Sequence, residues 1–411
     1  MDSAVIETWR WFGPTDVTTI SDVMQTGAQG VVSALHHVPD GEVWHPDAIA
    51  KRQAEIATTA DGRPSGLSWM VVESLPVSED IKRQTGEWRS HIANYKQSLA
   101  NLAAAGVTKV CYNFMPVIDW TRTDLAWRLP HGGTCMRFDA IDFAAFDIHI
   151  LKRQGAKECV PADIADAAAA RYAKMGNAER MRLVDNILAG LPGAADVLSL
   201  ETVHEHLAHY GAIAPERLRR HLFDFLEEVV PVAGRLGIRL CCHPDDPPFS
   251  LMGLPRIMST EEDYDAMLAH LDDAASGMTL CSGALGARPD NDLPGLMQRF
   301  GGRVHFLHLR NVRLEGSRVG DSFHESEHLG GSVDMVALIA TILAEEARRR
   351  AAGRTDADIP MRPDHGQDIL DDLTRHAQPG YPLIGRLKGL AELRGVATAM
   401  TLKSSDAGLQ S

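Results

Sequence analysis

The chain has 411 residues, of which 45% are hydrophobic and 23% charged, and its formal net charge is −14. These proportions are ordinary for a globular protein with a large buried core. The charge argues against a general nucleic-acid-binding protein, because such a protein needs many basic side chains to displace phosphate counterions. A small anionic substrate stays compatible, since a metal ion or a local arginine can reverse the field within one pocket.

The sequence shows no targeting or membrane signal. Its N-terminal residues lack a basic segment followed by an apolar one, and no stretch reaches the roughly 18 consecutive apolar residues of a membrane span. The six cysteines show no spacing that indicates a disulfide framework. We therefore expect a cytoplasmic protein that has no membrane or nucleic-acid partner.

Short apolar, β-rich segments alternate with amphipathic helical segments along the chain. The pattern predicts eight strands, at residues 8–12, 30–35, 69–73, 109–115, 238–243, 278–281, 304–309 and 358–362. It predicts helices near residues 16–25, 46–60, 87–105, 261–271, 293–300, 333–352 and 384–394. Eight alternating strand–helix units predict a closed parallel (β/α)8 barrel, the TIM barrel. A doubly wound open sheet is disfavoured, because no Gly-x-Gly-x-x-Gly stands in the expected place.

The regular spacing breaks once, between Trp120 and about Arg217. This segment shows no clear strand pattern, and an alanine-rich stretch within it, residues 164–189, is predicted to be helical. An insertion after the fourth strand emerges at the C-terminal face of the barrel, where active sites lie. Residues 1–411 are therefore predicted to form one barrel domain, with residues 121–216 as a mainly helical inserted lid or dimer-contact subdomain.

Four residues with metal-binding side chains stand at the ends of the last four predicted strands: His243, Cys281, His308 and Asp364. Neighbouring strands lie about 4.8 Å apart, so side chains at one height of a barrel can converge on one point. Two imidazoles, a thiolate and a carboxylate suit a divalent transition metal. Any one of these residues alone would more often be structural. The matching register of all four predicts a metal site.

Other residues near these strands are predicted to have different roles. Cys242 and His305 should face away from the metal, because side chains alternate along a strand, and we expect both to be structural. Arg310 shares the parity of His308 and can reach an anionic substrate. The insertion holds three histidines at near-helical spacing, for which a solvated helix face is a simpler interpretation than a metal cluster: His204, His206 and His209.

Charged residues and prolines fill the loops that follow the predicted strands, as in the substrate-binding loops of barrels. His365 directly follows the predicted ligand Asp364, so it can act as an acid or base beside a metal-bound substrate. His324 lies in the loop after the seventh strand, where either substrate contact or simple solvation explains it. The predicted substrate-binding residues are Arg310, Asn311, Arg362 and His324.

Several longer motifs occur in order along the chain. They are TWRWFGP at 8–14, ALHH at 34–37, CYNFMP at 111–116, DWTRT at 119–123, HPDDPP at 243–248, HLRN at 308–311, RPDHG at 362–366 and GY at 380–381. In these motifs the sequence resembles the mannonate dehydratase family, and the resemblance covers nearly the whole chain.

The resemblance implies a hydro-lyase that converts D-mannonate to 2-dehydro-3-deoxy-D-gluconate in hexuronate (glucuronate) catabolism. It implies a barrel related to that of xylose isomerase, with Mn(II) or Fe(II) on the four ligands named above. It also implies that His365 and Tyr381 are the catalytic pair. Without the resemblance, Tyr381 would be read as an interfacial aromatic residue before the last helix.

Some alternatives stay open at this point. The sequence does not decide which of His365 and Tyr381 is the base and which the acid. A metal-dependent sugar isomerase or epimerase on the same barrel is a second possible function, although such enzymes tend to use more carboxylates and often a catalytic lysine. A non-catalytic sugar-acid-binding protein is a third. We expect a homo-oligomer, a dimer before other states.

Overall fold

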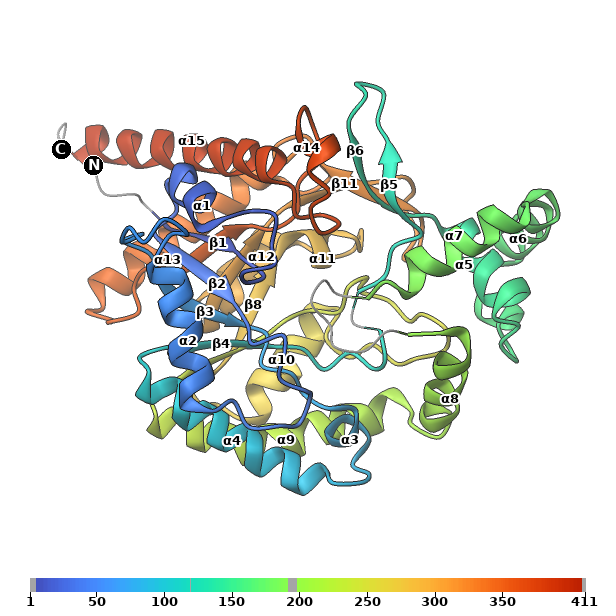
Figure 1. Cartoon of the computed structure of the whole chain (residues 1–411), viewed down its shortest axis with the longest axis horizontal. Coiled ribbons are helices and arrows are strands. Elements are labelled where there is room, and N and C mark those ends of the chain that lie inside the picture. The colour runs from blue at the N-terminus through green and yellow to red at the C-terminus, as the bar shows by residue number, and fades with distance from the viewer. Residues whose placement is uncertain (1–4, 119, 191–197, 409–411) are drawn as a thin grey trace.

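The computed structural model describes residues 5–118, 120–190 and 198–408, so Asp119 of the DWTRT motif lies outside the described residues. Eight parallel strands close into a barrel (Figure 1). In their order around the barrel they are β1 (Ile6–Arg10), β2 (Gly30–Ser33), β3 (Ser68–Glu73), β4 (Lys109–Tyr112), β7 (Arg239–Cys242), β8 (Ser276–Cys281), β9 (Val304–Leu309) and β12 (Pro360–Pro363). Each predicted strand overlaps one of these, and the predicted barrel is confirmed.

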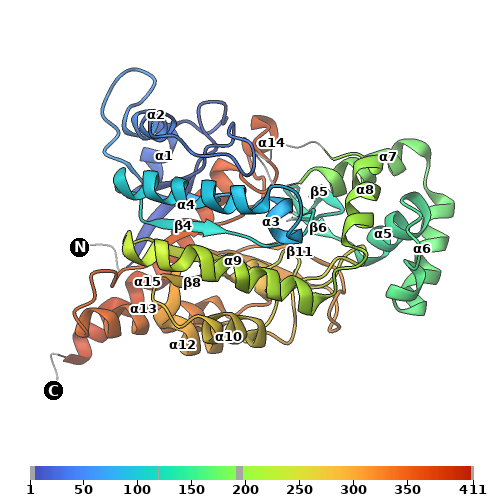
Figure 2. The same cartoon turned by 90° about the horizontal axis from the view of Figure 1, so that it is seen from below.

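Helices surround the barrel and cover its outer face (Figures 1 and 2). The long ones are α2 (Pro46–Ala57), α4 (Trp88–Ala104), α9 (Pro215–Arg235), α10 (Glu261–His270), α12 (Leu293–Phe300), α13 (Met335–Ala351) and α15 (Leu383–Gly408). Shorter ones are α1 (Ile20–Thr26), α3 (Glu79–Arg83), α11 (Ser282–Gly286) and α14 (Asp372–Arg375). The last helix, predicted to end at residue 394, continues to Gly408. None of the described helices is long and apolar enough to cross a membrane.

The side chains of the barrel strands divide between two apolar layers, because they alternate in direction. One set packs together inside the barrel: Val32, Val71, Cys111, Cys241 and Phe306. The other set, which includes Cys242, packs against the helices. His305 is also buried on its strand, and its Nε2 lies 3.0 Å from the carbonyl oxygen of Ala274. The structural roles predicted for Cys242 and His305 agree with these positions.

The segment after β4 contains a hairpin that the sequence pattern did not indicate. Strands β5 (Asp124–Arg128) and β6 (Thr134–Phe138) pair with each other, and β6 pairs with β11 (Phe323–Ser326), which pairs with β10 (Asn311–Leu314). The resulting antiparallel sheet has the order β10-β11-β6-β5. Half of it comes from the loop after β9, and local sequence pattern does not reveal pairing between such distant segments.

Helices make up the rest of this segment: α5 (Ala140–Ala145), the π-helix at Phe146–Ile150, the 3-10 helix at Lys157–Cys159, α6 (Ala162–Lys174), α7 (Asn177–Leu188) and α8 (Leu200–Tyr210). The alanine-rich stretch forms two helices, α6 and α7. Helices α5 to α7 project to one side of the barrel (Figure 2). His204 and His209 of α8 are exposed, as expected for a solvated face.

A buried carboxyl group joins α13 to the start of the last barrel strand. Glu346 Oε1 accepts a 2.8 Å hydrogen bond from the backbone N–H of Ile359, and the side chain is fully buried. Burial raises the pKa of Glu346 from 4.5 to about 7. This group therefore binds a proton more tightly in the folded than in the unfolded chain, and its contribution to stability is lost as pH rises from 4.5 to 7.

We predict that Glu346→Gln raises the melting temperature relative to the wild type at pH 8 but not at pH 5. The expected gain is about 2 kcal/mol, or about 3 °C, because the neutral amide avoids a buried charge. Thermal unfolding of both proteins at the two pH values measures it.

The neighbouring Glu345→Gln is the control and should lower stability at pH 8. Ion pairs with Arg348 and Arg349 outweigh burial and lower the pKa of Glu345, so its ionised form stabilises the fold. An effect of Glu346→Gln that is equal at pH 5 and pH 8 would contradict the prediction.

Candidate active site and metal centre

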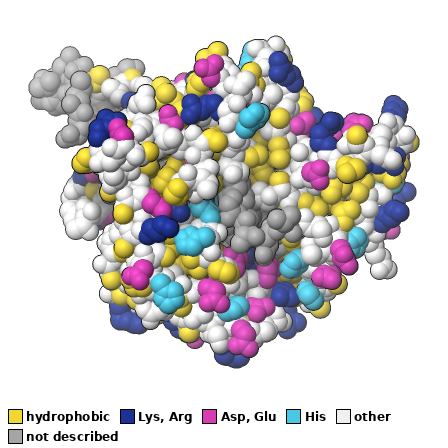
Figure 3. Space-filling model, in the orientation of Figure 1, with side chains coloured by type: hydrophobic (Ala, Val, Ile, Leu, Met, Phe, Trp, Pro, Cys, Tyr) yellow, Lys and Arg dark blue, Asp and Glu magenta, His cyan; other side chains and the backbone are white. Residues whose placement is uncertain are grey.

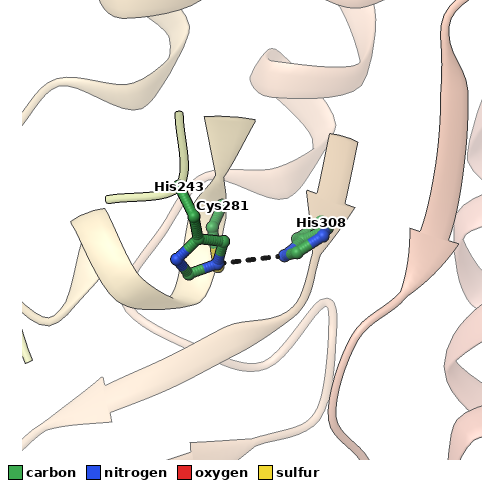
Figure 4. Close-up of side chains that lie close together, drawn as sticks. All are labelled: His243, Cys281 and His308. Atoms are coloured by element: carbon green, nitrogen blue, oxygen red, sulfur yellow. Dashed lines mark hydrogen bonds between the residues drawn. The ribbon is translucent and has the colours of Figure 1, made fainter. Parts of the chain in front are cut away.

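Three of the four predicted metal ligands converge at the C-terminal mouth of the barrel (Figure 4). Their ligand atoms, from His243, Cys281 and His308, all lie within 4.8 Å of one another. Cys281 and His308 are paired in register on β8 and β9, and His243 directly follows β7. Neighbouring parallel strands thus bring the three side chains together, as the register predicted.

Asp364, the fourth predicted ligand, follows β12 and lies at the same place. Its Oδ2 is 3.5 Å from Cys281 Sγ. Burial raises the pKa of this carboxyl group, but the adjacent cations, Arg362 first among them, outweigh burial and hold the pKa well below its usual value. Asp364 therefore offers anionic oxygen atoms at neutral pH beside the three converging side chains.

Hydrogen bonds fix which histidine nitrogens are free to bind a metal. His243 Nδ1 is 2.7 Å from the carbonyl oxygen of Pro244, which can only accept, so Nδ1 carries the proton. His308 Nε2 is 3.2 Å from Glu73 Oε2, a carboxylate oxygen. The other two nitrogens, His243 Nε2 and His308 Nδ1, face each other at 3.2 Å.

A metal ion between these two nitrogens would accept a lone pair from each, and Arg362 Nη2 lies 3.4 Å from His308 Nδ1. Burial lowers the pKa of His243, so the ring stays neutral at pH 7. Nitrogen ligands of one transition-metal ion lie about 3 Å apart, and a thiolate and a carboxylate complete the set. The residues present therefore fit a divalent transition metal, with its histidines oriented by outer hydrogen-bond partners.

Glu73, at the end of β3, orients this site and was not predicted. Its carboxylate accepts hydrogen bonds of 2.9 and 2.7 Å from Nε and Nη2 of Arg362, and it lies 3.0 Å from Arg10 Nη1. It also holds the outer nitrogen of His308. A polar residue at the end of a barrel strand is the signal that could have identified it, as it identified the four ligands.

His365 and Tyr381, the predicted catalytic pair, stand side by side next to the ligands. Their rings meet edge to face, with centroids 5.1 Å apart. Both line a cavity that is also lined by His243, Arg362 and Asp364. Gly380 permits this approach, because its φ of +81° suits glycine and a Cβ there would collide with Met136 and crowd the His365 ring.

The titration behaviour of the pair follows from burial. Burial, and then Arg310, lowers the pKa of His365, so its imidazole is neutral at pH 7. Burial raises the pKa of Tyr381 to about 12, so its phenol is protonated. One neutral imidazole and one protonated phenol therefore face the same cavity.

Buried charges around the cavity nearly cancel before a metal is counted. Four guanidinium groups and four carboxylates lie within this network, and each is at most 8% exposed: Arg10, Arg122, Arg310, Arg362, Glu73, Asp246, Glu325 and Asp364. Arg386, buried against the ring of Tyr381, adds one positive charge. A divalent cation would make the site clearly positive, which suits an anionic substrate although the whole chain is acidic.

Of the four predicted substrate-binding residues, only Arg362 lines the cavity. Arg310 is buried behind it, where its three guanidinium nitrogens contact carboxylates of Asp246, Glu325 and Asp364. These ion pairs occupy the guanidinium, which makes Arg310 a support of the site. Arg310 does lie on the same side of its strand as His308, as predicted. The carboxylates that surround it come from distant loops, which the sequence pattern does not reveal.

Asn311 and His324 lie away from the cavity, so the structure does not support them as substrate contacts. The amide of Asn311 is used entirely on the backbone of its own loop: it donates to His328 and Val333, and accepts from Val312 and Val333. His324 bonds Glu315 at 2.9 Å and packs on Trp127 in the antiparallel sheet. Asn311 and His324 were predicted to contact substrate because they lie in loops at the catalytic face. Such a position in the sequence does not determine the direction in which a side chain points.

The chain is similar to known proteins over nearly its whole length. Residues 5–406 match the family model described as D-mannonate dehydratase (UxuA). The chain belongs to the mannonate dehydratase family. A curated mannonate dehydratase of Rhizobium meliloti is 58% identical over 394 residues, which cover 96% of each chain. The family that the motifs resemble is thereby confirmed.

Solved structures agree with the barrel. The crystal structure of mannonate dehydratase from Streptococcus suis serotype 2 matches with a TM-score of 0.74 and 29% identity, over 98% of this chain and 95% of that one. A xylose isomerase-like TIM barrel protein of Mycobacterium smegmatis matches with a TM-score of 0.50 and 14% identity, over 97% and 99% of the chains. The second likeness shows the barrel fold alone.

We predict that Cys281→Ser weakens metal binding at least tenfold, because a hydroxyl replaces the thiolate among the converging ligands. Elemental analysis after dialysis against limiting Mn(II) measures the effect. Cys242→Ala is the matched control: it removes a buried thiol of the outer core and should keep full metal content. Equal metal content in the Cys281→Ser and wild-type proteins would contradict the assignment.

Proposed function

We propose that this protein dehydrates D-mannonate to 2-dehydro-3-deoxy-D-gluconate, with His365 and Tyr381 as the proton-transfer groups. The observation that carries the proposal is the contact of these two side chains in one cavity beside Asp364. Membership of the mannonate dehydratase family and the 58% identity to a named relative support it. The substrate is a sugar acid, and the nearly balanced cavity charge suits its carboxylate once a cation is bound.

The reaction breaks the C2–H and C3–O bonds of the substrate and releases water, and the resulting enol becomes a ketone. A proton next to a carboxylate is very weakly acidic, because its removal creates a second negative charge. His243, Cys281, His308 and Asp364 would hold Mn(II) or Fe(II), which supplies Lewis-acid stabilisation of that charge when bound. The mixed set of imidazole, thiolate and carboxylate ligands accepts either ion.

The protonation states of the catalytic pair favour one division of roles. The neutral imidazole of His365 can take the C2 proton. The phenol of Tyr381, protonated at neutral pH, can give a proton to the departing C3 hydroxyl. Arg362 adds positive potential at the wall of the cavity, where it favours binding of the carboxylate.

We also propose that the protein acts in the cytoplasm as a homodimer. The six cysteines are all free, which suits a reducing compartment. Hydrophobic side chains are exposed on the projecting part of the molecule over α5 to α7 (Figure 3), and Met181 of α7 is 66% exposed. Apolar exposure on a projecting element favours contact with a second copy.

We predict that His365→Ala and Tyr381→Phe each lower turnover of D-mannonate at least 100-fold while metal content stays at the wild-type level. Each substitution removes one proton-transfer group and no metal ligand. A colorimetric assay for 2-keto-3-deoxy acids, with elemental analysis of the same samples, measures both quantities. Near-wild-type turnover by both metal-loaded variants would overturn the assignment of the pair.

We predict that chelation abolishes turnover and that Mn(II) or Fe(II), added anaerobically, restores it. Mg(II) should restore far less, because thiolate and imidazole are poor ligands for it. Activity of a protein shown by elemental analysis to be metal-free, or equal recovery with Mg(II), would contradict the proposed centre.

A further inference from the structure

A buried network of four charged side chains lies behind the catalytic histidine. Arg122 and Arg310 each contact both Asp246 and Glu325, and all four side chains are at most 4% exposed. The Arg122 bonds measure 2.9 Å to Asp246 Oδ1 and 3.0 Å to Glu325 Oε1. Breaking such a network is costly, because it leaves an unpaired buried charge.

Glu325 reaches this network from outside the barrel. It lies on β11, where Phe323 and Glu325 point inward while His324 points outward. The inward direction is fixed by pairing with β10, opposite Val312, and by Phe323, which stacks on Phe138 of β6 at 5.5 Å. The antiparallel sheet therefore delivers one carboxylate to the C-terminal mouth of the barrel.

Glu325 contacts the catalytic ring directly. Its Oε1 lies 3.1 Å from His365 Nδ1. Arg310 Nη1, which donates to the same oxygen at 2.9 Å, also contacts this ring nitrogen. The Nδ1 edge of the His365 ring therefore contacts both Glu325 and Arg310, which form an ion pair with each other. Nε2, the other ring nitrogen, lies 3.8 Å from Asp364 Oδ1 at the cavity.

Arg310 Nη1 also lies 3.4 Å from His365 Nε2. The other contacts of the ring are edge-on contacts with aromatic side chains, so Glu325 and Arg310 are the groups that hold its Nδ1 edge. Tyr381 and Trp120 meet the ring edge to face at 5.1 and 6.3 Å. Glu325 is not among the described residues that line the cavity. Glu325 would therefore affect a substrate in the cavity only through the orientation of His365.

We propose that Glu325 is a positioning residue for the dehydration: it holds the Nδ1 edge of His365 so that Nε2 faces the substrate. This inference rests on the proposed function, because it gives His365 a role in proton transfer. The proposal gives the antiparallel sheet a function: the sheet positions Glu325. The barrel does not need this sheet in order to close. Outer carboxylates of this kind typically change activity 10- to 100-fold when removed.

Two substitutions test the proposal. Glu325→Asp keeps a charge between the two arginines, which protects the fold, but withdraws the carboxylate from Nδ1. Glu325→Gln keeps the length and removes the charge. Both should lower kcat about 10- to 100-fold, with KM within about threefold and metal content unchanged, because the metal ligands and cavity wall remain.

Glu315→Asp is the matched control. Glu315 belongs to the same sheet region, where it bonds Arg137 and His324, and it does not reach the cavity. It should leave kcat unchanged. Melting temperatures of all variants, measured with metal bound, show whether a lost activity reflects lost folding.

A double-mutant cycle separates positioning from a general structural role. On a His365→Ala background, Glu325→Asp should change the residual rate less than threefold, since the residue it positions is gone. Crystal structures of the metal-loaded wild type and Glu325→Asp give the readout where the residual rate is too low to measure. The His365 ring should be rotated in the variant.

Three results would overturn the proposal. The first is an unchanged kcat in both Glu325 variants, and the second is an equal loss of rate with and without His365. The third is a Glu325→Asp structure in which the His365 ring is not rotated and the metal has been lost, because the loss of activity would then reflect the loss of metal. A wild-type protein that yields no product from D-mannonate would instead refute the proposed function. The ring orientation in the two crystal structures still tests the positioning role in that case.

Discussion

The bidentate ion pair between Arg362 and Glu73 is the interaction on which the site depends. It joins β12 to β3, which are not neighbours in the barrel, across the mouth where the ligands converge. Glu73 in turn orients His308, and Arg362 holds Asp364. Because both members are buried, loss of either would leave a charge without compensation and would free a proposed metal ligand as well. The pair therefore links the positions of β3 and β12 to the positions of His308 and Asp364, two of the proposed metal ligands.

The predictable part of the site follows from strand register. His243, Cys281 and His308 could be identified because residues at the ends of neighbouring parallel strands must meet, whatever the intervening helices do. Tyr381 could not, because it reaches His365 through a loop that turns at Gly380. Only the resemblance to a family indicated it.

Glu325, which sequence reasoning missed, lies on a strand whose partners are distant in the sequence. It faces inward because β11 pairs with β10 and with β6, and β6 belongs to an insertion that showed no strand pattern. Asn311, predicted to contact substrate, illustrates the same limit, since its amide binds the backbone of a loop whose path no local pattern predicts. Apolar periodicity predicts which elements exist, whereas charges buried between loops depend on tertiary pairing.

A single peptide unit connects the proposed metal ligand Asp364 to the proposed proton-transfer group His365, because the two residues are consecutive. A bound ion of larger radius that pushed Asp364 outward would therefore also move His365. The position of the His365 imidazole relative to the substrate would thus depend on the radius of the bound ion. Tight binding and fast turnover can consequently rank metals differently, and the ion that the site holds most strongly need not be the one with which it works best.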